Sequence, residues 1–304
     1  SVHEPGLLHH LLPPTHQMTI LLGVVNLNQL ERHKMKKSKI LVGSLATVLA
    51  VGALTGLGAS AAMATGRGKP KPTVVLVHGA FADSSGWSAV TQKLLDDGYP
   101  VVAAANPLRG VASDAAQVRA LLDSIAGPII LVGHSYGGSV ISEAAAGDKD
   151  VKALVYVAAF VPEAGETAAE LSNKFPGSTL GETLKSVSTP GGHTDLYIDP
   201  QLFPQQFAAD VPVAQAKLYA VSQRPIDQAA LNEPQLGEQA WHRIPSYALI
   251  PGADKNIPAA AQRWMADRAH AKVVTVKGAS HMVFVAQPAV TTALIERAAY
   301  ETAK

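Results

Sequence analysis

A serine flanked by glycines, at the junction between an apolar run and a helical pattern, constrains this chain more than any other feature. The apolar run, residues 128–132, leads directly into Gly-His-Ser-Tyr-Gly-Gly at 133–138, and a helical pattern follows. This is the setting of a nucleophile elbow, a turn so sharp that its central residue is strained and its glycines let strand and helix approach. The sequence therefore predicts that Ser135 is a nucleophile whose Oγ projects at the edge of a sheet. The helix N-terminus beside it would stabilise negative charge on a reacting group.

Short apolar runs alternate with amphipathic stretches from Thr73 onward. The runs predicted to be strands are residues 73–77, 101–105, 128–132, 151–158, 247–250 and 273–276. Apolar residues at helical spacing lie at 85–97, 112–125 and 135 to about 146, and helical patterns also follow the last two strands. Near-continuous apolar strands separated by helices predict an α/β fold, a mostly parallel sheet of about six strands with helices on both faces.

One long segment interrupts this alternation. Between Pro162 and about Pro245 no strand is predicted, and Pro, Gly and polar residues are frequent, with helical patches at 211–221 and 227–231. An excursion of this length is too long for a simple loop. We predict a helical cap at about 163–245, over the carboxyl edge of the sheet, where ligands bind in open α/β proteins. The cap would then wall the substrate pocket.

The N-terminal part has the pattern of a secretory signal peptide at residues 35–64. A basic start at 35–39 precedes an apolar run at 40–57, and Ala-Met-Ala at 62–64 fits a cleavage motif. A membrane anchor is the alternative, because the apolar run is borderline in length for a bilayer span. We expect cleavage near Ala64 and hence a secreted protein, extracellular or periplasmic, without stable membrane association.

The remaining boundaries follow from composition. Residues 1–34 are rich in Pro and His without helical or strand period, and are interpreted as a leader of non-native or normally untranslated origin. Residues 65–72 are rich in Gly, Pro and Lys and are interpreted as a flexible leader into the folded domain at 73–304.

Composition excludes several classes of chemistry. The 304 residues include no cysteine, which rules out disulfides, thiolate catalysis and Cys-ligated zinc. A formal net charge of +1 gives no electrostatic case for binding nucleic acid or an anionic membrane. We expect no metal and no cofactor; the oligomeric state stays open.

A second motif follows the first predicted strand, at His78-Gly79-Ala80-Phe81. Beside a nucleophile elbow, a loop in this place supplies a backbone N–H to an oxyanion hole. We predict Ala80 as that donor, with the N–H of Tyr136 as its partner. The alternative is an ordinary loop between strand and helix. His78 itself is interpreted as a structural residue that ties the loop by hydrogen bonds.

A nucleophilic serine needs a base, and the base needs a carboxylate to orient it. After an elbow of this kind the acid and then the base follow in chain order. Asp254 follows the strand at 247–250, and His281 follows the last strand. These are the predicted acid and base, with a helix-capping role as the alternative for Asp254. Competing residues lie elsewhere: His193, His242, Asp195, Asp199 and Asp210 in the predicted cap, His270 at a helix end and Asp267 on a helix.

The order of these motifs resembles one branch of a known family. From about Thr73 onward the chain resembles the plant methylesterases and hydroxynitrile lyases of the α/β-hydrolase fold, and their bacterial esterase relatives. The motifs that carry the resemblance are residues 76–80, 133–138, 158–162, 254–258, 262–264 and 277–282. The resemblance implies an α/β-hydrolase fold with its helical cap inserted between the sixth and seventh strands of the fold, and a small-molecule ester substrate.

Two positions favour an esterase within that branch. Gly79 and Met282 stand where the lyases have a threonine and a lysine, so cyanohydrin cleavage is not expected. We predict a serine carboxylesterase for small to medium esters, with Phe81, Phe160 and Met282 in the substrate pocket. A lactonase, thioesterase or cofactor-free perhydrolase would use the same triad, and a ligand-binding protein on the hydrolase scaffold is a rival of another class.

Overall fold

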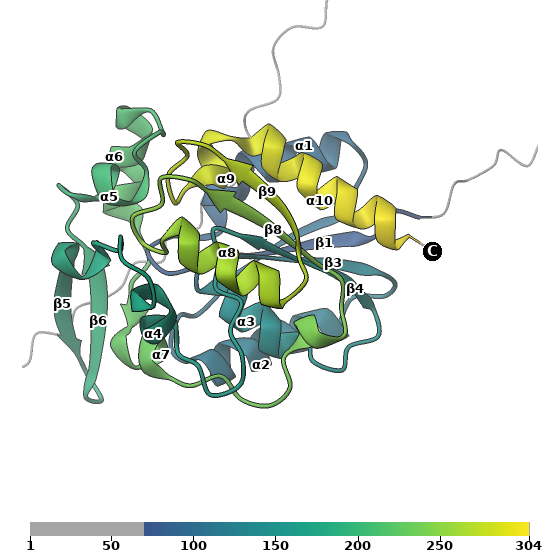
Figure 1. Cartoon of the computed structure of the whole chain (residues 1–304), viewed down its shortest axis with the longest axis horizontal. Helices are drawn as coiled ribbons and strands as arrows, with labels where there is room; N and C mark the ends of the chain where they lie inside the picture. The colour runs from purple at the N-terminus through teal and green to yellow at the C-terminus, as the bar shows by residue number, and fades with distance from the viewer. Residues whose placement is uncertain (1–69, 304) are drawn as a thin grey trace, which may run out of the picture. The chain divides into compact units, whose positions relative to one another are not determined.

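A single parallel sheet organises the part of the chain that the structure, a computed structural model, describes, residues 70–303 (Figure 1). Its six strands lie in the order β2-β1-β3-β4-β8-β9, and all neighbours are parallel. The strands are β1 (Thr73–Val77), β2 (Val101–Ala104), β3 (Ile129–His134), β4 (Val151–Val157), β8 (Ser246–Pro251) and β9 (Lys272–Val276). The predicted α/β class and the six strands are confirmed.

The predicted leader at 1–34, the predicted signal peptide at 35–64 and all but the last residues of the flexible leader at 65–72 lie outside the described residues. Of the helices between residues 70 and 303, none is long and apolar enough to cross a membrane.

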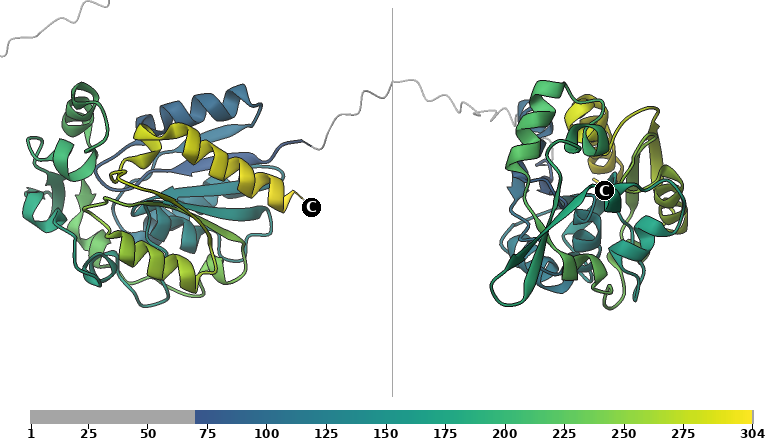
Figure 2. Two further views of the ribbon diagram at one scale, coloured as in Figure 1. Left: turned by 45° about the horizontal axis from the view of Figure 1, so that its top comes forward. Right: turned by 90° about the vertical axis from the view of Figure 1, so that its left-hand side faces the viewer.

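Helices cover both faces of the sheet, as Figures 1 and 2 show. On one face α1 packs against α10, which also contacts β4, and α2 packs against α3 on the other. The core helices are α1 (Ser88–Asp96), α2 (Val111–Asp123), α3 (Gly137–Ala144), α8 (Ala259–Arg268), α9 (Val283–Ala286) and α10 (Pro288–Thr302), with a 3₁₀ turn η1 (Ser84–Trp87) before α1.

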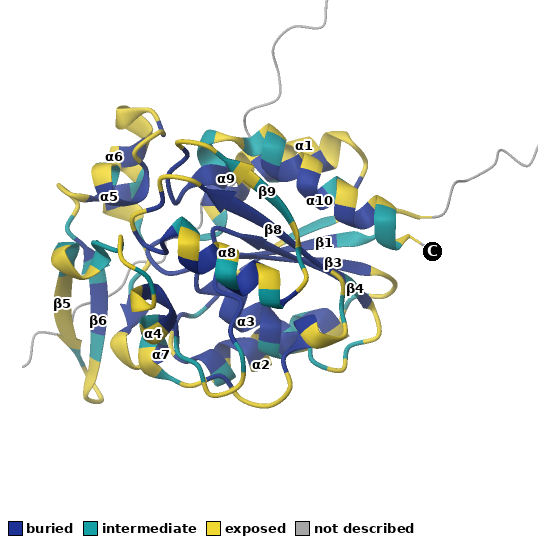
Figure 3. Ribbon diagram, viewed as in Figure 1, coloured by how far each residue is buried: buried dark blue, intermediate teal, exposed yellow. Residues whose placement is uncertain are grey.

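The central strands are buried on both faces (Figure 3). Every residue of β3 and of β8 is buried, and in β1 and β4 only one residue each is partly exposed. A strand between two helical layers has no solvent face, which explains why these segments read as continuous apolar runs rather than as alternating ones.

The insertion between β4 and β8 contains strands as well as helices, which corrects the prediction of a helical cap without strands. A three-stranded antiparallel sheet, β5-β6-β7, accompanies its helices. Its elements are α4 (Ala168–Asn173), η2 (Leu180–Thr183), β5 (Leu184–Thr189), β6 (His193–Ile198), α5 (Phe203–Phe207), α6 (Val213–Ser222), β7 (Ile226–Asp227), α7 (Gln228–Asn232) and η3 (Ala240–His242).

The cap sheet escaped prediction because β5 buries none of its six residues and so has no apolar period. The sequence signal that predicts a hairpin here is the pair Gly191-Gly192. In the structure both residues have positive φ angles, +89° and +82°, as hairpin turns require. The insertion leaves after the fourth of the six described strands and returns at the fifth. The predicted insertion point lies between the sixth and seventh strands of the fold, so the described sheet has two strands fewer before the cap.

Close backbone packing forms the turn after β3. An ideal Cβ on Gly133 would lie 2.6 Å from the carbonyl oxygen of Gly137, and one on Gly137 would lie 2.7 Å from that of Val77. A Cβ on Gly138 would overlap the carbonyl oxygen of Phe160. The requirement for small residues beside Ser135 therefore has a steric cause.

Replacing Gly138 by alanine should destabilise the domain by about 1–3 kcal/mol or more, because its Cβ would meet backbone that cannot move aside. Gly181→Ala is the matched control, since a Cβ there meets no atom within 4 Å and should change stability by about 0.5 kcal/mol or less. Urea unfolding of the two variants measures the difference. Equal stability of Gly138→Ala and the wild type would contradict the packing described here.

Candidate active site

Ser135 lies in the turn between β3 and α3, with its backbone in the left-handed region at φ +54°. Few non-glycine residues adopt this conformation, so the surrounding structure must hold it. Its carbonyl oxygen accepts hydrogen bonds from the N–H groups of Gly138 (2.9 Å) and Phe160 (3.2 Å). The side chain lines a cavity between the sheet edge and the cap, although the residue is only 7% exposed.

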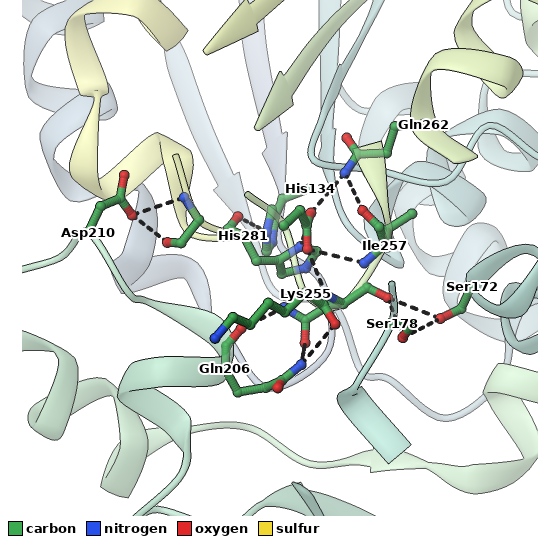
Figure 4. A network of polar contacts seen from close by, with 12 residues as sticks. His134, Ser172, Ser178, Gln206, Asp210, Lys255, Ile257, Gln262 and His281 are labelled. Carbon is green, nitrogen blue, oxygen red and sulfur yellow. Dashed lines mark hydrogen bonds and ion pairs between the residues drawn. The ribbon is translucent and has the colours of Figure 1, made fainter. Parts of the chain in front are cut away.

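Asp254 and His281 are joined by a buried hydrogen bond. His281 Nδ1 lies 2.7 Å from Asp254 Oδ2, and both side chains are fully buried (Figure 4). A carboxylate accepts, so Nδ1 carries the proton, and Nε2 is the basic nitrogen of the neutral ring. Within residues 70–303 that Nε2 has no hydrogen-bond partner.

The three predicted residues are thus brought together in part. The acid and the base are in contact, whereas Ser135 and His281 line the same cavity without a hydrogen bond between their side chains.

Asp254 is also held by the turn that leads into α8. Its Oδ1 accepts from the backbone N–H groups of Asn256 (2.8 Å) and Ile257 (3.1 Å). Its Oδ2 accepts from Gln262 Nε2 at 2.8 Å in addition to His281. The helix-capping alternative does not hold, because the N-cap of α8 is Pro258; the Asp254 carboxylate binds the turn before the helix and His281 at once. Gln262, which sequence reasoning placed only within a motif, is a positioning residue for it.

The two predicted oxyanion donors line the same cavity. Neither the backbone N–H of Ala80 nor that of Tyr136 donates a hydrogen bond within the described residues. The Tyr136 hydroxyl donates to Asp114 Oδ2 at 3.0 Å, which fixes the Tyr136 ring. Burial raises the pKa of the Tyr136 hydroxyl, and also that of Asp114.

His78 ties the loop that carries Ala80, as interpreted from the sequence. Its Nε2 accepts from the backbone N–H of Asn106 (3.0 Å), so Nδ1 carries the proton and donates to the Gly79 carbonyl (3.0 Å). Burial lowers the pKa of His78, which keeps it in this neutral form. A Cβ on Gly79 would lie 2.6 Å from Ser135 Cβ, so a threonine there would press on the elbow.

His134 is a site residue that sequence reasoning missed. It is completely buried, its Nε2 donates to the backbone carbonyl of His281 at 3.2 Å, and the two ring centroids lie 4.8 Å apart. Burial, with the neighbouring His281 as the next cause, lowers the pKa of His134 well below its ordinary value. The available signal was its place directly before Ser135, at the end of a strand that points at the site.

The cavity that contains Ser135 and His281 has a volume of about 170 Å³. Its lining consists of Ala80, Phe81, Ser135, Tyr136, Phe160, Ala168, Ala169, Ser172, Asn173, Ser178, Leu180, Gly181, Leu184, Phe207, Leu231, Asn256, Ile257 and His281. No Asp, Glu, Lys or Arg side chain of the described residues takes part in it. The cavity therefore suits a small, mainly apolar and uncharged ligand.

Phe81 and Phe160 line this cavity, as predicted for the pocket, but Met282 does not. Met282 is buried at 1% exposure and faces a separate small hollow beside Gly86 and Tyr219. The physical reason is its backbone, because the N–H of Met282 donates to the Phe207 carbonyl at 3.1 Å and the residue caps α9. The assignment of Met282 to the pocket is corrected accordingly.

The chain is similar in sequence and in fold to known α/β hydrolases. The model of the alpha/beta hydrolase family matches residues 74–294. Norfluorocurarine synthase 2 of Strychnos sp is 27% identical over 241 residues, which cover 70% of this chain and 90% of that protein. Methylesterase 9 of Arabidopsis thaliana is 25% identical over 240 residues, 70% of this chain and 93% of that protein. The crystal structure of polyneuridine aldehyde esterase superposes with a TM-score of 0.65 at 18% identity, covering 75% of this chain and 98% of that one.

The two buried neutral histidines predict a loss of stability in acid. Both His78 and His134 have a pKa below the ordinary value of 6.5 in the folded chain. Below pH 6.5 these two histidines bind protons in the unfolded chain but stay neutral in the folded chain. Their contribution to the free energy of unfolding is therefore fully present above pH 6.5 and is lost as the pH decreases. The free energy of unfolding should decrease by up to about 1.4 kcal/mol per pH unit for each such histidine.

Urea unfolding between pH 8 and 5 measures this slope. His134→Gln retains an N–H donor for the His281 carbonyl and removes one titrating group. Its slope below pH 6.5 should therefore be shallower than that of the wild type. Identical slopes would show that His134 does not carry the effect.

Proposed function

Since this chain belongs to the alpha/beta hydrolase family, we propose that it is a serine carboxylesterase that cleaves small to medium esters by way of an acyl-enzyme. One observation carries the proposal: His281, hydrogen-bonded to the buried Asp254 carboxylate, lines the same cavity as Ser135, whose backbone is strained. A relative that is named as a methylesterase supports an ester as the substrate.

The proposed first step is attack on the ester carbonyl. His281 Nε2 removes the proton of Ser135 Oγ as Oγ bonds to the carbonyl carbon, and Asp254 stabilises the imidazolium that results. This step needs Oγ and Nε2 within hydrogen-bond distance, a contact that free active sites commonly form only with substrate bound. The backbone N–H groups of Ala80 and Tyr136 would hold the oxyanion, to which the N-terminus of α3 adds its dipole.

The intermediate then collapses, and the ester C–O bond breaks. His281 gives its proton to the leaving alcohol, and the acyl group stays on Ser135. Water attacks this acyl-enzyme with His281 again as the base, which releases the carboxylic acid and restores the serine hydroxyl.

The cavity supports a neutral substrate. Its walls are mostly aromatic and aliphatic, and apart from His281 the polar side chains among them carry hydroxyls and amides without charge. A lactone or a thioester would fit the same chemistry, and a pure binding role would leave the Asp254–His281 pair without purpose. We also propose that the enzyme acts outside the cytoplasm, on the strength of the signal-peptide pattern at 35–64.

Replacing Ser135 by alanine removes the nucleophile and should lower kcat/KM for 4-nitrophenyl butyrate by about 10⁴-fold or more. Ser139→Ala is the matched control, because Ser139 is buried one turn further along α3 and does not line the cavity. It should keep activity close to that of the wild type. A Ser135→Ala variant that hydrolyses the ester at the wild-type rate would refute the proposal.

The uncharged cavity predicts discrimination against charged acyl groups. The 4-nitrophenyl monoesters of butyric and succinic acid have acyl chains of equal length, but the second carries a carboxylate. Placing that charge among apolar walls without a cation to pair with should reduce kcat/KM by about 100-fold or more. Equal kcat/KM values, after correction for the spontaneous hydrolysis of each ester, would exclude this cavity as the acyl site.

A further inference from the structure

Each of the three loops that carry the proposed chemistry is hydrogen-bonded to the cap. The loop with Ala80 is held where the N–H of Phe81 donates to the Arg224 carbonyl at 2.9 Å. The loop with Asp254 and the loop with His281 are held from the segment around α5 (Figure 4). Residues of the insertion therefore help to hold these three loops in place.

His281 is held on both sides. Before it, the backbone N–H of Ser280 donates to Asp210 Oδ1 at 3.1 Å, and the Ser280 hydroxyl donates to the same oxygen. After it, the N–H of Met282 donates to the Phe207 carbonyl at 3.1 Å. The Phe207 ring also packs edge-on against the His281 ring, with centroids 4.7 Å apart.

Gln206, which precedes Phe207 in α5, holds the loop that carries Asp254. Gln206 Nε2 donates to the Lys255 carbonyl (2.9 Å) and to Asn256 Oδ1 (3.1 Å), while Gln206 Oε1 accepts from Thr179 Oγ1 (2.8 Å). Gln206 is buried, and all its amide groups are used within the described residues. The end of α5 and the residues just after it therefore clamp the acid loop and the base loop together.

We propose that Asp210 is a positioning residue for His281. Asp210 fixes the loop that carries His281, so that His281 Nε2 faces Ser135. The proposal rests on the proposed function of Ser135 and His281. A carboxylate oxygen that accepts two hydrogen bonds holds the loop more strongly than a neutral acceptor does. Asp210 does not line the cavity, so its loss changes the orientation of the base rather than the binding of substrate. Misplacement of a catalytic group by about 1 Å costs about 100-fold in rate.

Steady-state kinetics of Asp210→Ala and Asp210→Asn test this role. We expect kcat of Asp210→Ala to fall by about 10- to 100-fold with KM within about two-fold of the wild type. Asparagine keeps an oxygen that accepts from Ser280, so Asp210→Asn should recover most of the loss. Glu182→Ala is the matched control: it removes one charge from an exposed cap residue whose side chain makes no hydrogen bond within the described residues. It should behave as the wild type.

A spectroscopic readout separates this proposal from the proposed function. The His281 Nδ1 proton, shared with Asp254, should give a low-field proton resonance, assigned by its absence in His281→Ala. The resonance should shift or broaden in Asp210→Ala and stay in place in Glu182→Ala, whatever ester the enzyme accepts. Should Asp210→Ala fail to fold, Ser280→Ala removes one of the two hydrogen bonds and should give a smaller effect in the same direction.

An Asp210→Ala variant with wild-type kcat and an unmoved resonance would overturn the proposal. Equal losses in Asp210→Ala and Glu182→Ala would overturn it as well, since they would trace the effect to charge rather than to the contact with Ser280.

Discussion

The close approach of backbone around Ser135 is the constraint on which the rest of the structure depends. Gly79, Gly133, Gly137 and Gly138 are each packed so tightly that an added Cβ would collide with backbone or with Ser135. Strand β3, helix α3 and the loop of His78 therefore form one rigid unit, and the positive φ of Ser135 is its consequence. The proposed nucleophile and both oxyanion donors belong to this unit. Their relative positions are set mainly by this backbone packing, and the His78 side chain and the Arg224 carbonyl hold the loop of Ala80.

The acid and the base are positioned in a different way. Asp254 and His281 stand on loops after β8 and β9; β9 is the edge strand of the sheet, whereas β8 pairs with both β4 and β9. Their support comes from side chains: Gln262 on α8, His134 on β3, and Gln206 and Asp210 from the cap. The two supports from the cap, Gln206 and Asp210, are long-range contacts that require the cap to be folded. A cap that serves this role cannot be exchanged freely for another, even one with a similar pocket.

The limits of sequence reasoning follow from the same division. The six strands of the parallel sheet, the glycine-flanked turn at Ser135 and the places of Asp254 and His281 on loops after two strands were predictable, because apolar runs and glycine spacing are local signals. Residue contacts across the fold carry no such signal. Asp210 was set aside because it follows no strand, yet it binds the residue next to His281. Met282 is predicted to line the pocket, but it lies against a separate hollow, with its backbone N–H bound to the Phe207 carbonyl.

The charge state of His134 matters to the proposed chemistry because its ring lies beside the ring of His281. Its ring lies 4.8 Å from that of His281, so a charged His134 would oppose the imidazolium that forms when His281 takes the serine proton. Burial lowers the pKa of His134, and the residue stays neutral while it still donates an N–H to the His281 carbonyl. Asp254 is then the one ionisable partner in hydrogen-bond contact with the His281 ring among the described residues. Burial of His134 therefore keeps a second positive charge away from the imidazolium that His281 forms in the proposed mechanism.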